Sequence, residues 1–433
     1  MITSKLIMEE QPKFLADLAK IIAIPSVRSE AKSHAPFGLG PRQVLSEVVQ
    51  LARQYDFKYE VVNDAMAYVQ WGDDNDNYFG IVGHLDVVGA GDNWTSDPFT
   101  LRQRGDYLYA RGILDNKGPS IACLYALKIL KDQGYLPKKT IRIIFGSDEE
   151  SGSNDIPLYL AKEKAPQFGF TPDCKFPVVY GERGIVNYEI FTPINEDQVS
   201  EITGDQAPDH VPDELKIMIN QESYVAKGKR SPTNAPELGV NAITVLTQQI
   251  LAQDLVHGEL KDYFTWLDQA LRDKHYGEGL GLEFSDPASG RLIVTPYFLQ
   301  KSDAGWTLKI AMRYPVTYTE SQVTEQLKKA VFSGSQIKII RSMPSVMHDP
   351  NSPEIQILSQ VYEDLTKLDG TPVTTTGATY ARSMPNIVAF GPSFPGQKGI
   401  AHKEDEWMKI DDLMLNLTIY LNAIFKLAIE GGE

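Results

Sequence analysis

The sequence predicts an α/β protein in which a mixed sheet with helices on both faces is interrupted by an inserted α+β domain. Three observations lead to this prediction. The chain of 433 residues is too long for one ordinary hydrophobic core. Its first third alternates amphipathic helices with short apolar strands, which is typical of an open α/β sheet. Its middle has an α+β pattern, and its C-terminal part returns to the first pattern.

The N-terminal part begins with two amphipathic helices. Phe14, Leu18 and Ile22 recur at helical spacing, and Pro25 follows the last turn. Later in this part, the apolar run T-I-R-I-I-F-G is typical of a buried strand. The elements expected here are helices at 14–22, 44–55, 117–133 and 156–164, and strands at 67–71, 78–83, 140–146 and 178–180.

The middle of the chain contains a hairpin signal, because two alternating runs are joined by K-S-D-A-G. The segment G-E-G-L-G is expected to be a loop, since its spacing does not fit a dinucleotide motif. The elements expected in the middle are strands at 185–192, 291–300, 306–315 and 336–341, and helices at 241–252, 257–273 and 320–332. The C-terminal part is expected to hold helices at 354–367 and 411–428 and a strand at 387–391.

These patterns divide the chain into three segments. We expect residues 345–433 to fold back onto the sheet formed by residues 1–184. Residues 185–344 would then form a separate inserted domain.

Composition limits the classes of function. The formal net charge is −15 and no Lys/Arg cluster stands out, so we expect no nucleic-acid partner. Two cysteines, Cys123 and Cys174, cannot form a disulfide framework, which indicates a reducing, cytoplasmic compartment. The N-terminus has no pattern of a signal peptide, and no long uninterrupted apolar run indicates a membrane span.

His84 and Asp86, in G-H-L-D-V-V, come at the end of a predicted strand. In open α/β sheets, ligands bind beyond the carboxyl ends of the strands. Residues two apart in an extended chain face the same side, so Asp86 could hydrogen-bond the His84 ring and fix its tautomer, as carboxylates do for metal-bound histidines. The alternative is a strand-end histidine capped by a local aspartate.

Three further motifs carry carboxylates. Asp115, in R-G-I-L-D-N-K-G-P, is either a metal ligand or a cap of the following helix. Glu149 and Glu150, in G-S-D-E-E-S-G, are either two solvated charges or a ligand beside a free base. Asp173, in T-P-D-C-K-F-P, is by itself a turn residue, and Cys174 is either a small buried residue or a soft ligand.

His402, in G-I-A-H-K-E-D-E-W, lies in a polar loop and alone would be a solvated histidine. Together, two histidines, three carboxylates and a spare glutamate are the ligand inventory of two metal ions that share a bridging carboxylate. Imidazole ligands favour zinc, whereas magnesium and calcium sites favour oxygen alone. We therefore expect two zinc ions as cofactors, with manganese or cobalt as alternatives.

In chain order, G-H-L-D-V-V, R-G-I-L-D-N-K-G-P, D-E-E-S-G, P-D-C-K-F-P-V-V-Y-G-E-R-G and A-H-K-E-D-E-W resemble the aminoacylase, carboxypeptidase and dipeptidase family of two-zinc hydrolases. The resemblance covers almost the whole chain. Within the family the sequence is most similar to PepV-type dipeptidases, because of F-P-V-V-Y-G-E-R-G, A-M-R-Y-P-V and G-A-T-Y-A-R-S-M-P-N. It implies a discontinuous catalytic domain of residues 1–184 and 345–433 and a substrate-enclosing lid of residues 185–344.

The resemblance implies two metal sites that share Asp115, whose peptide bond to Asn116 is expected to be cis. The remaining ligands would be divided between the two sites, His84 and Asp173 at one and Glu150 and His402 at the other.

It also implies the roles of the residues around the metals. Glu149 would be the general base that takes the proton of a metal-bridging water as hydroxide attacks the scissile carbonyl. Asp86 would orient His84. Arg313, in A-M-R-Y-P-V, would grip the substrate carboxylate through its planar guanidinium, and Thr379 would line the substrate pocket. The lid would limit the length of the substrate, which favours dipeptides.

Two positions depart from the family's pattern. Pro232 stands where most members have a lid histidine that stabilises the oxyanion, and proline offers no hydrogen bond. Loss of one oxyanion donor reduces turnover by roughly 10²–10³-fold. Asp209 replaces an amide in the family pattern N-M-V-P-D. His210, the next residue, is a candidate for the missing donor.

The expected function is therefore hydrolysis of unblocked dipeptides. One alternative is a related N-acyl-amino-acid amidohydrolase. Asp209 argues against it, because a carboxylate there suits a free ammonium and repels an acidic acyl group. The other is a catalytically weakened metal- or peptide-binding relative, which Pro232 favours and the retained Glu149 disfavours. We expect a monomer that takes a short peptide as its partner.

Overall fold

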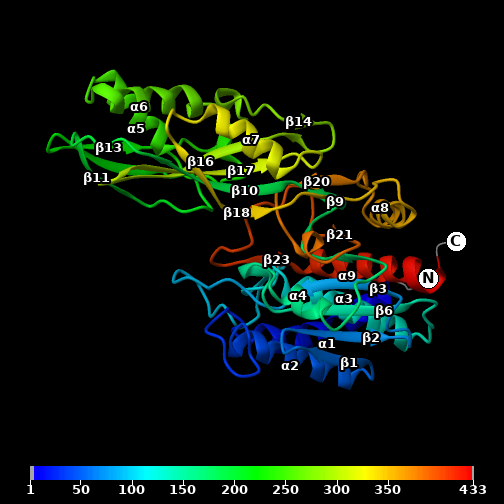
Figure 1. Ribbon diagram of the computed structural model, residues 1–433. Coiled ribbons are helices and arrows are strands. Elements are labelled where there is room, and N and C mark those ends of the chain that lie inside the picture. The colour runs from blue at the N-terminus through cyan, green and yellow to red at the C-terminus, as the bar shows by residue number, and fades with distance from the viewer. Residues whose placement is uncertain (1–3, 432–433) are drawn as a thin grey trace. The chain divides into compact units, whose positions relative to one another are not determined.

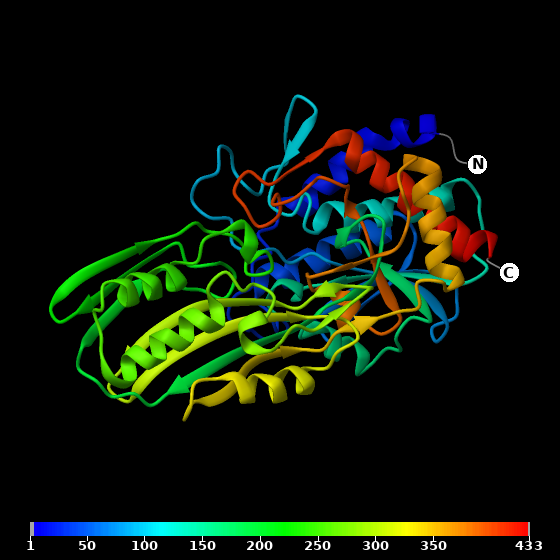
Figure 2. The same ribbon diagram turned by 90° about the horizontal axis from the view of Figure 1, so that it is seen from above.

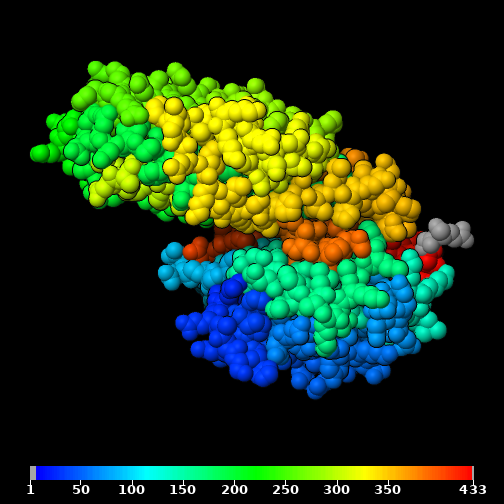
Figure 3. Space-filling view, in the orientation of Figure 1, coloured from blue at the N-terminus to red at the C-terminus, as the bar shows by residue number. Residues whose placement is uncertain are grey.

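The computed structural model describes residues 4–431, which divide into two compact units (Figure 1). Unit 1 comprises the chain up to Tyr180, then His348–Val373 and the chain from Ala378 onward. Unit 2 comprises Gly181–Met347 and the short return Thr374–Gly377. In the space-filling view of Figure 3, unit 1 is blue, cyan, orange and red, and unit 2 is mainly green and yellow. Unit 1 is therefore discontinuous in sequence.

A mixed sheet forms the centre of unit 1. The strands lie in the order β1-β2-β6-β3-β7-β21-β9, and β19 and β20 both pair with β9 at one edge. Strands β6, β3, β7 and β21 are mutually parallel, whereas β1, β2 and β9 pair antiparallel with their neighbours. The strand bounds are β1 Lys58–Val62, β2 Met66–Trp71, β3 Tyr78–His84, β6 Thr140–Gly146, β7 Phe168–Thr171, β9 Val178–Glu182, β19 Val346–Met347, β20 Val373–Thr375 and β21 Ile387–Phe390.

Alternating side chains along these strands face two different cores, as the period of two in a β-strand requires. In β2, Ala67 and Val69 point into the larger core, and Met66 and Tyr68 into the smaller one. The larger core is covered by α1 Ser4–Ile22, α2 Leu39–Gln54, α3 Lys117–Asp132, α8 Pro353–Thr366 and α9 Ile410–Ile424, and the smaller by α4 Asp155–Leu160 and the 3-10 turn Tyr380–Arg382. The predicted fold of a mixed sheet with helices on both faces is confirmed.

Helix α9 is a long apolar helix of unit 1. With the π-helical turn Phe425–Glu430, it makes a run that is long and apolar enough to cross a membrane. Most of that run is buried, and α9 packs against α3 and α8 in the larger core. Burial therefore accounts for its composition.

Unit 2 is an α+β body in which helices α5, α6 and α7 lie over an antiparallel sheet (Figure 2). The sheet order is β16-β17-β10-β18, and β11-β12-β13 form a second sheet. Predicted strands 291–300 and 306–315 are β16 and β17, joined by a tight turn after Ser302. The bounds are β10 Gly184–Thr192, β11 Val199–Gly204, β12 Glu214–Ile219, β13 Glu222–Lys227, α5 Ala242–Ala252, α6 Gly258–Leu271, β16 Ile293–Ser302, β17 Gly305–Tyr314, α7 Glu320–Ala330 and β18 Gln336–Met343.

Several short elements were not predicted. In unit 1 these include strands β1 and β7 and a small sheet of order β23-β5-β4. In unit 2 the sheet β11-β12-β13 was missed. The remaining short strands are β4 Arg102–Arg104, β5 Tyr107–Tyr109, β8 Cys174–Lys175, β14 Ser285–Asp286, β15 Gly290–Arg291, β22 Pro392–Ser393 and β23 Trp407–Lys409.

Candidate metal centre

Six predicted residues converge at the carboxyl ends of the parallel strands, where ligand sites form in open α/β sheets. His84 is the last residue of β3, and Glu149 and Glu150 begin the 3-10 turn Glu149–Ser151 that follows β6. The other three come from loops, Asp173 after β7, Asp115 just before α3, and His402 before β23.

Asp115 lies between the two histidines, with one carboxylate oxygen toward each. Its Oδ1 is 3.0 Å from His84 Nε2, and its Oδ2 is 3.0 Å from His402 Nε2. His84 Nε2 is also 3.6 Å from Asp173 Oδ2, and His402 Nε2 is 3.0 Å from Glu150 Oε2. The cluster thus has two halves that share the Asp115 carboxylate.

The ring of His84 is oriented by the main chain of Asp86. His84 Nδ1 is 2.9 Å from the Asp86 carbonyl oxygen, which can only accept, so Nδ1 donates there. In the neutral ring, Nε2 then carries the lone pair and faces the carboxylates. Asp86 Oδ1 is more distant from Nδ1, at 3.5 Å. The predicted orientation of His84 by Asp86 thus has the carbonyl as its nearer partner.

The Asp86 carboxylate also binds the turn that follows β6. Its two oxygens accept hydrogen bonds from the backbone N–H groups of Glu149, at 3.2 Å, and Glu150, at 3.1 Å. Asp86 is almost fully buried. It therefore fixes the turn that presents both glutamates to the cluster.

The electrostatics of the cluster are dominated by crowded, buried carboxylates. Burial, followed by the nearby Asp173 charge, holds the pKa of Glu149 well above its usual range. Burial and neighbouring Asp115 also raise the pKa of Glu150. Burial raises the pKa of Asp173 to about 7, although the His84 charge opposes the shift.

His402 and Asp115 are both stabilised in their charged forms by the contacts between them. Hydrogen bonds that His402 donates to the carboxylates of Asp115 and Glu150 raise the pKa of His402 to about 11. Burial would raise the pKa of Asp115, but hydrogen bonds from His402 and His84 outweigh it and hold this pKa below its usual range.

Carboxylate oxygens and imidazole Nε2 atoms that face one another at hydrogen-bonding distances suit divalent cations. The atoms of His84, Glu149 and Asp173, and those of His84, Asp115 and Glu150, lie within 4.8 Å of one another. The residues present therefore fit a dinuclear metal site.

The loop of Asp115 is tied to that of Asp173. The Asp115–Asn116 peptide bond is cis, as expected. Buried Asn116 donates from Nδ2 to the carbonyl of Pro172 at 2.5 Å and accepts at Oδ1 from Ser120 Oγ at 2.7 Å. Gly83 is required beside it, because a Cβ there would lie 2.1 Å from Ser120 Oγ.

Tyr380 packs against His84, and Asp155 binds Tyr380. The sequence analysis predicted neither residue. The Tyr380 ring packs edge-on to that of His84 at 6.3 Å, and its hydroxyl donates to Asp155. Asp155 Oδ2 also accepts from the backbone N–H of Ser147 at 2.7 Å. Thr379, the residue before Tyr380, is buried and caps the 3-10 turn by accepting from Ala381 N at 3.1 Å. Tyr380 follows Thr379 in G-A-T-Y-A-R-S-M-P-N, and that motif is the signal that could have pointed to it.

The other predicted residues belong to unit 2. Arg313 is half-buried on β17. Asp209 is exposed and accepts from His210 Nδ1 at 2.9 Å. His210 and Pro232 face each other in an isolated antiparallel bridge, so this histidine lies next to the position where the family pattern has one.

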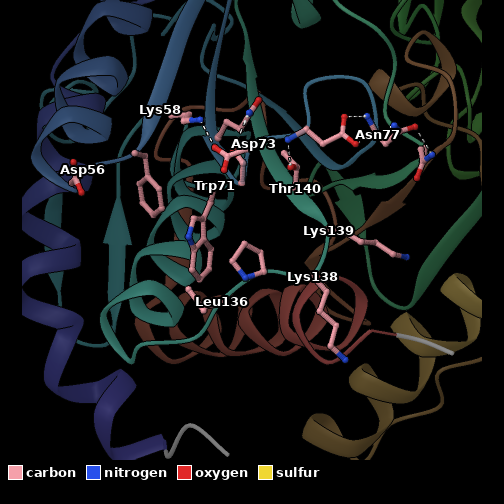
Figure 4. A pocket seen from close by; sticks show the side chains of 15 residues that line it. Asp56, Lys58, Trp71, Asp73, Asn77, Leu136, Lys138, Lys139 and Thr140 are labelled. Carbon is pink, nitrogen blue, oxygen red and sulfur yellow. Dashed lines mark hydrogen bonds and ion pairs between the residues drawn. The ribbon is translucent and has the colours of Figure 1, made fainter.

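A separate pocket of about 690 Å³ lies at the other end of the sheet (Figure 4). It is lined by residues at the start of β6 and the end of β2, such as Thr140 and Trp71. Asp74 N donates to Thr140 Oγ1 at 2.9 Å, and Lys58 pairs with Asp73. The residues predicted from the motifs are not among those that line this pocket.

Comparisons with known proteins agree with this geometry. Residues 80–426 match the model of peptidase family M20/M25/M40. YtjP of Bacillus subtilis, named as a presumed dipeptidase, is 32% identical, over 98% of each chain. Human carnosine dipeptidase 1 has the same fold, with a TM-score of 0.62, 13% identity and 97% of each chain covered.

A second solved structure shares the fold at lower identity. The Bacillus subtilis YXEP protein, described as a dinuclear metal-binding peptidase of the M20 family, aligns with a TM-score of 0.55, 10% identity and coverage of 98% of this chain and 100% of the other. Because the family match spans most of the sequence and agrees with the carboxylate and histidine cluster, the chain belongs to peptidase family M20/M25/M40 and is a metal-dependent hydrolase.

Proposed function

We propose that this protein is a two-metal peptidase that hydrolyses the peptide bond of unblocked dipeptides. The observation that carries the proposal is the buried cluster in which Asp115 faces both His84 and His402 while Glu149 stands beside them. The dipeptidase names of its relatives support this substrate class.

The ligands divide between two positions. His84, Asp115 and Asp173 would hold one cation, and Asp115, Glu150 and His402 the other. Bound there, two divalent cations supply a polarised scissile carbonyl and a water molecule of lowered pKa. The mixed nitrogen and oxygen donors favour zinc, with manganese or cobalt as alternatives.

Glu149 is the general base. Glu150 is the glutamate that contacts His402, at 3.0 Å. The pKa of Glu149 is raised by burial, which suits a group that accepts a proton and returns it. Glu149 takes one proton from the attacking water as the new C–O bond forms. It then delivers that proton to the leaving amine nitrogen as the C–N bond breaks. Asp86 positions Glu149 by holding its backbone N–H.

Unit 2 is proposed as the lid that encloses the substrate. Arg313 would bind the substrate carboxylate with its guanidinium fork, and Asp209 would bind the free ammonium group. Thr379 of unit 1 would line the pocket. His210, opposite Pro232, is the candidate for the missing oxyanion donor. If His210→Ala leaves turnover unchanged, this role of His210 is ruled out.

Pro232 also supports a second candidate function, that of a metal- or peptide-binding relative with weakened catalysis. An N-acyl-amino-acid amidohydrolase is the third. We further propose a cytoplasmic monomer, which the two free thiols, Cys123 and Cys174, fit.

The test is a substrate panel. Purified protein is incubated with zinc or manganese and with unblocked dipeptides, tripeptides and N-acylated amino acids. The proposal expects cleavage of the dipeptides alone, and its loss with a chelator and in Glu149→Ala. Cleavage of the acylated compounds instead would show the amidohydrolase. Metal binding without turnover would show the weakened relative.

A further inference from the structure

Glu406 is a buried carboxylate that the proposed reaction does not use. Its Oε2 accepts from Arg111 Nη1 at 2.8 Å and from the N–H of Gly112 at 3.2 Å. Its Oε1 accepts from the N–H groups of Leu114, at 2.8 Å, and Asp115, at 3.2 Å. One fully buried carboxylate thus holds three backbone N–H groups of the loop that carries Asp115.

The main chain fixes Glu406 opposite this loop. Its carbonyl accepts from the N–H of Ala110 at 3.2 Å. Strand β23 begins at the next residue, and Trp407 pairs with Tyr109 of β5. His402 lies four residues earlier on the same segment. One stretch of chain therefore supplies a candidate ligand and the group that holds the loop of another.

Arg111 extends the connection to a third loop. This arginine is buried, and its Nη2 donates to the carbonyls of Gly89 and Ala90 at 3.2 and 3.3 Å. Its guanidinium also lies over the Trp94 ring, 5.3 Å from the centroid. The planar fork suits this task, because it can bind the carboxylate and the carbonyls together. The Arg111–Glu406 ion pair therefore joins three loops, namely the loop after His84, the loop before α3 and the loop that carries His402.

We infer that Glu406 is a positioning residue for the metal centre. It fixes the backbone of Asp115 so that the two carboxylate oxygens face His84 and His402, each at 3.0 Å. This inference rests on the proposed function, in which Asp115 binds both cations. A site of this kind must hold its ligands to within about 0.5 Å, which a loop without regular structure does not ensure by itself.

The test is a titration of the metal-free full-length protein with cobalt(II), followed by visible absorption. Glutamine at position 406 keeps the shape but has a single acceptor oxygen, and its NH₂ would face N–H donors. Glu406→Gln is expected to weaken cobalt affinity by roughly 10–100-fold and to change the absorption spectrum. Glu406→Asp keeps the charge opposite Arg111 but is too short to reach both pairs of donors. It should fold more readily and lose less affinity.

A matched control is available in the same unit. Glu163 forms a similar ion pair with buried Arg142, at 2.7 Å, toward the opposite end of β6. Glu163→Gln should lower the thermal midpoint as Glu406→Gln does, while its cobalt affinity and spectrum stay those of the wild type.

Each result of these titrations either supports or overturns the inference. Wild-type cobalt affinity and spectrum in either folded Glu406 variant would overturn the inference and leave the proposed function intact. An equal loss of affinity in Glu163→Gln would also overturn it, because general destabilisation would then be the cause. A wild-type protein that binds neither cobalt nor zinc would overturn the proposed function itself.

Discussion

At the scale of single residues, Asp86 contacts three neighbours with different atoms. Its carbonyl accepts from the His84 ring, and its carboxylate holds the N–H groups of Glu149 and Glu150. The side chain therefore acts more directly on the turn that carries the proposed base Glu149 and the proposed ligand Glu150 than on His84. The separate roles of the carbonyl and the carboxylate can be tested by a substitution that changes the carboxylate and keeps the carbonyl.

Asp86→Asn should slow dipeptide cleavage while two metal ions remain bound. The amide can accept only one of the two N–H bonds, so the turn that positions Glu149 is held less firmly, whereas the carbonyl that orients His84 is unchanged. We expect kcat to fall by roughly 10–100-fold. Kinetics and metal analysis of the same sample check this. Loss of one metal ion would instead show that the carboxylate mainly holds a metal ligand in place, either Glu150 or His84.

Glu149→Gln should abolish most of the turnover without unfolding the protein or removing metal. A positioned general base contributes roughly 10²–10⁴-fold, and glutamine cannot accept the proton. Steady-state rates measured alongside metal content give the result. The exposed Glu325 of α7 provides the control, since Glu325→Gln should leave the rate unaltered. A loss of less than tenfold in Glu149→Gln would argue against the assigned base.

Asp155 gives a prediction about pH. Burial, with a further contribution from Asp86, raises its pKa to about 7 in the folded protein. Because the folded pKa lies above the unfolded value, the stabilising contribution of the protonated form is fully present below the unfolded pKa. It is lost as the pH rises through about 7.

The wild type should therefore lose stability relative to Asp155→Asn between about pH 4 and pH 7. Asparagine can still accept the bonds that Oδ2 receives from Ser147 N and Tyr380. Urea unfolding of both proteins across this range measures the difference. A difference that stays constant with pH would show that Asp155 is ionised throughout.

At the scale of elements, α9 and α3 form the centre of the larger core. Leu417 of α9 is fully buried, and Leu417→Ala should reduce the free energy of unfolding by about 2–5 kcal/mol. Leu136, which is 79% exposed, is the control, because Leu136→Ala should change it by less than about 0.5 kcal/mol. Equal effects of the two substitutions in denaturant unfolding would contradict the assigned packing.

Long elements were predictable from sequence because their periodicity is strong. Helices α3, α5 and α8 and the hairpin β16-β17 match the predicted ranges to within a few residues. Short strands were not, because their pairing depends on distant partners. Strand β7 has four residues, and its neighbours β3 and β21 are far away in sequence. The β12-β13 hairpin turns at Asn220 and Gln221, both with positive φ, without the usual glycine signal.

At the scale of the whole molecule, the sequence predicts those site residues whose chemistry can be recognised from a local motif alone. His84, Asp115, Glu149, Glu150, Asp173 and His402 stand in motifs that mark strand ends and loops. Of the supporting residues, Tyr380 and Glu406 also stand in quoted motifs, but nothing in the local sequence assigns them a role, and Asp155 stands in none. Asp155, Tyr380 and Glu406 act through hydrogen bonds to segments distant in sequence, so only the folded chain identifies them. The return of Thr374–Gly377 to unit 2 was likewise not predicted.

The central claim is that two metal ions held by this cluster are needed for peptide hydrolysis. The most direct measurement adds manganese or zinc stepwise to metal-free protein and records bound metal and dipeptide cleavage in the same samples. We predict two ions per chain at full activity, and loss of both binding and cleavage in Asp115→Ala. Cleavage that persists in metal-free protein, or full activity with Asp115→Ala, would contradict the claim.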